Sequence, residues 1–118
     1  MATGKPIKTQ SQQPLKLYVK QQFTDRLQTI EMLGATMFGK TAADKLHNEI
    51  RRRILMLPNL PKANPKFRFV KSTPEKEYRA ILYEKFYVVY SVTKTRVTVL
   101  TIVHQSLSPK KLKMTSPK

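Results

Sequence analysis

Two side chains of this sequence have the chemistry to act on a phosphate group. Arg79 stands among β-branched and aromatic residues, where a guanidinium could bind an anion or stabilise developing negative charge. His104 follows an apolar run and could transfer a proton near neutral pH. We take both as candidate catalytic residues. The alternatives are a strand arginine that binds a loop carbonyl or a carboxylate, and a histidine without a catalytic partner, since no second histidine or carboxylate pair stands at a telling spacing.

A second group of side chains could bind a nucleic acid or an acidic protein. Three consecutive arginines at 51–53 would fan over about 200° of a helix and could not all face one phosphate, so a solvated helix face is the alternative interpretation. Tyr87 could stack on a base, because alternation places it on the opposite strand face from Tyr90, which we expect in the core. The candidate contact residues are Arg51, Arg52, Lys85, Tyr87, Arg96, Lys110 and Lys111.

The composition limits the class of protein. The 118 residues suffice for one domain and include no cysteine, which excludes disulfides, a cysteine nucleophile and thiolate-bound metal clusters. We expect no metal, no cofactor and no small-molecule substrate. No apolar run approaches the roughly 18 residues of a membrane span, and residues 1–14 lack the apolar core of a signal peptide. We therefore expect a cytoplasmic protein that does not bind a membrane.

The net charge of +16 points to a polyanionic partner. Residues 1–66 hold 12 basic and 4 acidic side chains and residues 67–118 hold 11 and 3, so each half carries +8. The excess is therefore spread over the chain and does not come from a tail. A charge spread in this way favours a neutralising acidic protein partner over a catalytic groove.

The hydrophobic periodicity predicts the elements that position these residues. Residues 15–20 alternate like an edge strand, and apolar residues from Phe23 to Met37 recur at helical spacing, with Gly34 expected to weaken or end that helix. Thr41 is expected to cap a second helix that Pro58 stops. Two prolines in 59–65 predict an irregular crossing segment.

Three strands follow, at 78–83, 86–92 and 97–104, joined by connections of hairpin length. This order predicts an α+β fold in two layers: an N-terminal strand, a helical hairpin and an antiparallel sheet, with the helices on one face and the other face partly open. We expect a flexible arm at 1–14, one domain at 15–108 and a basic tail at 109–118.

Two segments carry a resemblance to a known family. FGKTAADKLHNEIRRRILMLPNLP is similar to the second helix, and EYRAILYEKFYVVYSVTKTRVTVLTIVHQSLSP to the hairpin pair, of the RelE/ParE superfamily of bacterial toxins from type II toxin–antitoxin modules, also called plasmid stabilisation proteins. The resemblance covers roughly residues 15 to 109. It implies a small basic toxin neutralised by a cognate acidic or amphipathic antitoxin that wraps around it.

The superfamily has two branches with different chemistry. Toxins of the RelE-like branch are ribosome-dependent mRNA endoribonucleases. In these toxins, basic residues on the sheet act on RNA. Arg79 matches one such position. The other positions of that set fall on Ile81 and Tyr87 and close to Ser106 and Leu112, none of which matches. The resemblance thus favours the ParE-like branch, which poisons DNA gyrase. RelE-like cleavage of mRNA on the ribosome remains the alternative, and a non-enzymatic nucleic-acid-binding module is a third.

Overall fold

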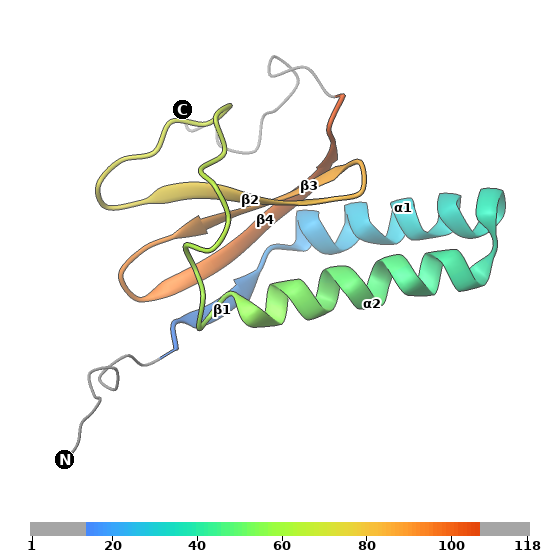
Figure 1. The fold of residues 1–118 in the computed structure, drawn as a ribbon, viewed down its shortest axis with the longest axis horizontal. Coiled ribbons are helices and arrows are strands. Elements are labelled where there is room, and N and C mark those ends of the chain that lie inside the picture. Colours follow the sequence, from blue (N-terminus) through green and yellow to red (C-terminus); the bar gives the residue numbers. More distant parts are fainter. Residues whose placement is uncertain (1–13, 107–118) are drawn as a thin grey trace.

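A computed structural model describes residues 14–106 and confirms the predicted order of elements. The elements are β1 (Lys16–Val19), α1 (Gln21–Phe38), α2 (Lys40–Met56), β2 (Glu77–Tyr83), β3 (Phe86–Val92) and β4 (Arg96–His104) (Figure 1). The fold is α+β, as expected. The predicted arm, apart from Pro14, and the predicted basic tail lie outside the described residues. No helix of residues 14–106 is long and apolar enough to cross a membrane.

The four strands form one mixed sheet in the order β1-β4-β3-β2. β2, β3 and β4 are antiparallel neighbours, as predicted, but β1 lies parallel to β4, with Leu17 opposite Val97. The predicted antiparallel sheet is therefore confirmed for these three strands, and the N-terminal strand joins it in the parallel direction. An alternating pattern determines which face a side chain occupies, but it carries no information on strand direction.

The turn of the helical hairpin differs from the prediction. α1 continues through Gly34 to Phe38. Gly39, with φ 95°, is both the C-cap of α1 and the N-cap of α2. Thr41 lies inside α2 and does not cap it. A glycine inside a helix costs only about 1 kcal/mol relative to alanine, which packing can offset, whereas a positive φ strongly favours glycine. Gly39 therefore reverses the chain.

Two apolar clusters lie on the two faces of the sheet. The helical hairpin covers one face, as predicted, and its cluster includes Phe23, Ile50 and the fully buried Tyr90, which confirms the expected core position of that tyrosine. The second face is less open than expected. Phe67, two residues beyond the crossing segment, is 4% exposed, and its ring packs edge-on to Tyr87 at 5.4 Å between centroids.

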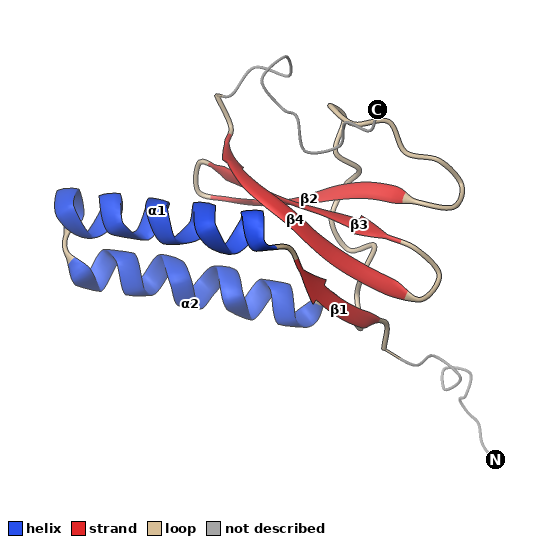
Figure 2. Ribbon diagram, turned by 180° about the vertical axis from the view of Figure 1, so that it is seen from behind, coloured by secondary structure: helices blue, strands red, loops and turns tan. Residues whose placement is uncertain are grey.

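The hairpin extends beyond the sheet that it covers. Figure 2 shows the ends of α1 and α2 nearest Gly39 projecting past β2, β3 and β4. The α1 side chains in this projection remain exposed, from 58% for Leu33 to 73% for Phe38. Leu33 and Met37 belong to the apolar stripe predicted from Phe23 to Met37, so the sheet is too short to cover the whole stripe.

Candidate functional site

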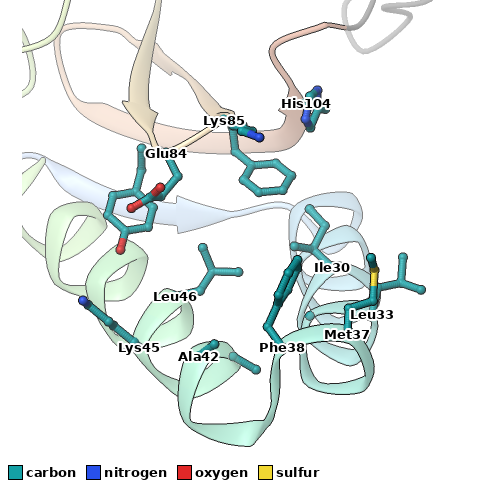
Figure 3. Close-up of a pocket in the computed structure, with 14 residues that line it drawn as sticks. Ile30, Leu33, Met37, Phe38, Ala42, Lys45, Leu46, Glu84, Lys85 and His104 are labelled. Atoms are coloured by element: carbon teal, nitrogen blue, oxygen red, sulfur yellow. The ribbon is translucent and has the colours of Figure 1, made fainter.

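An apolar groove lies between the projecting hairpin and the turn that joins β2 to β3. We call it the hairpin groove. It has a volume of about 710 Å³. Figure 3 shows its apolar side chains coming from α1 and α2 below and from the β2–β3 turn region, where β3 begins, above. The apolar lining includes Ile30, Leu33, Met37, Phe38, Leu46 and Phe86.

The helical period explains why α1 presents this lining. Ile30, Leu33 and Met37 follow each other at spacings of three and four residues, so they share one helix face. Ile30 is partly buried against the main core, while Met37, about two turns further along, is 69% exposed. The groove is therefore a continuation of the hydrophobic core into solvent. A surface of this kind is typical of a protein-binding site.

The rim of the hairpin groove is mainly basic. Lys45 on α2 and Lys85 in the β2–β3 turn line it, and Glu84 in the same turn is its acidic member. His104, the candidate catalytic histidine, also lines the groove. Ser106 N–H donates to Nδ1 of His104 at 3.1 Å, and the histidine ring packs edge-on to Phe86 at 5.5 Å between centroids. An apolar floor with a cationic rim suits a partner that is apolar on one side and acidic at its flanks.

Arg79, the other candidate catalytic residue, holds the crossing segment against the sheet. Its Nε donates to Oε1 of Glu77 at 2.9 Å, and its Nη1 donates to the carbonyl oxygen of Asn64 at 2.5 Å. The side chain is 14% exposed. The hydrogen bond from Arg79 holds the pKa of Glu77 below its ordinary value. Arg79 thus binds both a carboxylate and a loop carbonyl, as the non-catalytic interpretation of this residue describes.

The two candidate catalytic residues do not lie together. Arg79 pairs with Tyr90 on β3, and the neighbouring strand places His104 opposite Phe86. The two positions are therefore four residues apart along β3, or about 14 Å. The two side chains are therefore too far apart to contact the same reacting atom. Within residues 14–106, no group of three potential metal ligands is present either.

The arginine run on α2 is divided among different contacts. Glu49, one helical turn earlier, accepts hydrogen bonds from Arg52 Nη2 at 2.6 Å and Arg53 Nε at 3.0 Å. These bonds lower the pKa of Glu49 to about 2. The Arg53 guanidinium also lies 5.0 Å from the ring centre of Tyr83, whereas Arg51 is exposed. Because Glu49 precedes these arginines by three and four residues, the sequence contained the signal for this cluster.

The remaining predicted contact residues are dispersed. Lys85 is in the hairpin groove, Tyr87 lies under Phe67 on the opposite face of the sheet, and Arg96 begins β4 at the far end. Lys110 and Lys111 lie outside the described residues. Sequence reasoning missed the exposed part of the α1 stripe as a functional surface, because a stripe does not reveal where the covering sheet ends.

Comparison with known proteins identifies the family. Residues 17–108 match the family described as the ParE toxin of the type II toxin–antitoxin system parDE. The chain belongs to the ParE toxin family. No curated protein matches it closely.

Solved structures have the same fold as this ParE family member. The chromosomal ParDE system from P. aeruginosa matches with a TM-score of 0.61 and 14% identity over 76% of this chain and 95% of that chain. The archaeal RelE–RelB complex from Pyrococcus horikoshii OT3 matches with a TM-score of 0.50 and 13% identity, over 80% and 99% of the two chains. At these low identities, the TM-scores show a shared fold and nothing more.

Proposed function

We propose that this ParE family member is the toxin of a type II toxin–antitoxin module and that its cognate antitoxin neutralises it by laying an amphipathic helix into the hairpin groove. The observation that carries the proposal is the exposed apolar stripe of α1, with Leu33, Met37 and Phe38 between 58% and 73% exposed. The net charge of +16 supports an acidic partner.

The groove determines what such a helix must present. Apolar side chains repeating every three or four residues would pack on Met37 and Phe38 and complete the interrupted core. Acidic side chains at the edges of that stripe would lie near Lys45 and Lys85. Burying a large apolar side chain completely contributes about 1.5–3 kcal/mol, so covering three such side chains contributes at most about 9 kcal/mol, which helps to offset the entropic cost of association.

We further propose that the toxin inhibits growth by binding its target, with DNA gyrase as the target in the ParE-like manner, in the cytoplasm. Two features support binding rather than RNA cleavage. Arg79 already has Glu77 and a loop carbonyl as partners, and His104 lies about 14 Å away along the sheet. The matched RelE-like position is thus engaged in holding the fold together.

Induction of the chain without an antitoxin tests the target. A gyrase poison should stop growth and change plasmid supercoiling while translated messages stay intact. Cleavage of messages within ribosome-bound codons, with unchanged supercoiling, would overturn the gyrase proposal and favour the RelE-like alternative. Growth at the normal rate, with the folded protein present in the cells, would contradict the toxin function itself.

The neighbouring open reading frame supplies a second test. We expect a short acidic protein with a DNA-binding N-terminal part, which should copurify with this chain and restore growth when both are expressed. A partner that restores growth but binds equally well when the hairpin groove is altered would contradict the proposed docking site.

A further inference from the structure

A second hollow lies on the face of the sheet opposite the helices, where β1 meets the β3–β4 turn. Lys16 N–H donates to the carbonyl oxygen of Thr95 at 3.1 Å and so holds this turn beside β1 (Figure 1). The hollow has a volume of about 540 Å³. It is remote from the hairpin groove, and it is lined neither by the crossing segment, nor by Phe67, nor by the helical hairpin.

A row of hydroxyl groups crosses the sheet at this place. The register sets Tyr18 on β1 opposite Thr98 on β4, Thr98 opposite Ser91 on β3, and Ser91 opposite Tyr78 on β2. Three steps between neighbouring strands make this row about 14 Å long. The residues that alternate with it, such as Tyr90 and Val97, point into the core under the helices. The whole row therefore faces away from the hairpin.

Ser91 is the unusual member of the row. It is 3% exposed, it lines the hollow, and within residues 14–106 its hydroxyl has no hydrogen-bond partner. Thr93 differs, because its hydroxyl bonds to the backbone of Arg96 in the turn. A buried hydroxyl without a partner costs free energy, so its retention at the floor of an open hollow suggests that it donates to a ligand.

Three cations surround the hydroxyl row. Lys20, Lys76 and Arg96 line the hollow, and among the described residues no aspartate or glutamate does. The Arg96 guanidinium lies 5.0 Å from the ring centre of Tyr18, and the Lys76 ammonium lies 5.8 Å from that of Tyr78. These contacts position the two cations at opposite ends of the row. Neither cation forms an ion pair within residues 14–106, in contrast to the engaged Arg52, Arg53 and Arg79.

We propose that this hollow binds phosphate groups of a nucleotide or a nucleic-acid strand, with the Ser91 and Thr98 hydroxyls donating to phosphate oxygens and Arg96 and Lys76 neutralising the charge. Arginine, lysine, serine and threonine are among the side chains that contact phosphate in nucleic-acid complexes. A phosphate offers several acceptor oxygens, which suits clustered donors better than a single carboxylate does. The row is long enough to contact more than one phosphate of a strand.

Binding of three probes to the full chain tests the assignment: inorganic phosphate, ATP and a fluorescent oligothymidylate, measured by calorimetry and anisotropy. Arg96→Ala should weaken binding at least about tenfold, because it removes charge-assisted hydrogen bonds. The matched control is Lys94→Ala in the same turn, which removes one positive charge outside the hollow and should change binding much less. Equal losses in the two variants would mean diffuse attraction by a basic surface and would overturn the proposal.

Two uncharged substitutions separate the site from general electrostatics. Ser91→Ala and Thr98→Val each remove one hydroxyl and no charge, and each should weaken phosphate binding severalfold. Ser91→Ala should also leave the unfolding temperature unchanged or raise it, since the lost hydroxyl has no partner in the described chain. Unchanged phosphate binding in both variants would overturn the proposal.

The probes also distinguish the source of the phosphate. Tight binding of oligothymidylate alone assigns the site to a nucleic-acid backbone, and binding of ATP or inorganic phosphate at comparable strength assigns it to a free nucleotide or phosphate. Polyglutamate that competes equally well, with the same loss in Arg96→Ala, would overturn the phosphate assignment in favour of an acidic peptide. Substitutions in the hairpin groove should leave phosphate binding intact, so failure here is distinguishable from failure of the proposed antitoxin site.

Discussion

Replacing Met37 by alanine should weaken antitoxin binding without weakening the fold. Met37 lies on the exposed part of the α1 stripe and lines the hairpin groove. Met32 provides a matched control, because it is the same residue type on the same helix, is 70% exposed against 69% for Met37, and does not line the groove. The two alanine variants therefore remove similar side chains and differ mainly in the helix face that they alter.

The magnitude follows from the exposed fraction. Complete burial of a methionine side chain contributes about 1.5–3 kcal/mol, so the 69% that remains exposed on Met37 leaves about 1–2 kcal/mol to be gained when a partner covers it. Loss of that contribution raises Kd by about 5- to 30-fold. The free energy of unfolding of the chain alone should change by no more than about 0.5 kcal/mol in either variant.

Titration calorimetry of each variant with the antitoxin from the neighbouring reading frame measures this difference. Met32→Ala should bind as the unaltered chain does. If Met32→Ala lost as much affinity as Met37→Ala, or if Met37→Ala lost none, the antitoxin helix would not lie in the hairpin groove. Denaturant unfolding of the free variants provides the control for the fold.

Three further predictions concern the groups that hold the fold together. Arg79→Met should lower the unfolding temperature, with toxicity falling only as far as folded protein is lost; normal stability with no toxicity would place Arg79 on the target instead. Because hydrogen bonds lower the folded pKa of Glu49 from 4.5 to about 2, its pairing stabilises the fold above pH 4.5 and this contribution is lost as the pH falls toward 2. Glu49→Gln should therefore reduce the pH dependence of the unfolding temperature in that range. The same pH dependence in the variant would contradict the pairing of Glu49 with Arg52 and Arg53. Tyr90→Phe removes the hydroxyl that donates to the Pro61 carbonyl at 2.9 Å and should cost about 1–2 kcal/mol in denaturant unfolding, whereas a cost near zero would mean that water replaces this bond.

Much of the fold could be predicted from the sequence because its elements have clear periods. The step from period two to helical spacing near Phe23, and the return to β-branched residues after the crossing segment, gave the element order that the structure has. The two glycines of the hairpin show the limit of this reasoning. Gly34 and Gly39 look alike in sequence, yet only Gly39 has a positive φ, and that depends on where the chain must reverse.

The candidate site was harder to predict for a physical reason. The apolar stripe of a helix indicates which face of the helix is apolar. How much of that face is buried depends on how far the covering sheet extends, and this extent is a property of the tertiary structure. Leu33 and Met37 belong to the apolar stripe and are nevertheless exposed. The engagement of Arg52 and Arg53 by Glu49, in contrast, follows from spacings of three and four residues and needed no structure.

The projecting end of the hairpin has a consequence for the dynamics of the free chain. Around Gly39, α1 and α2 pack on each other but have no sheet beneath them (Figure 2). Elements with few buried contacts open locally at a lower free energy than the rest of a domain. Amide hydrogens near this turn should therefore exchange with solvent earlier than those of β3 and β4. A partner that fills the hairpin groove would slow that exchange, so the antitoxin would stabilise the least stable part of its toxin.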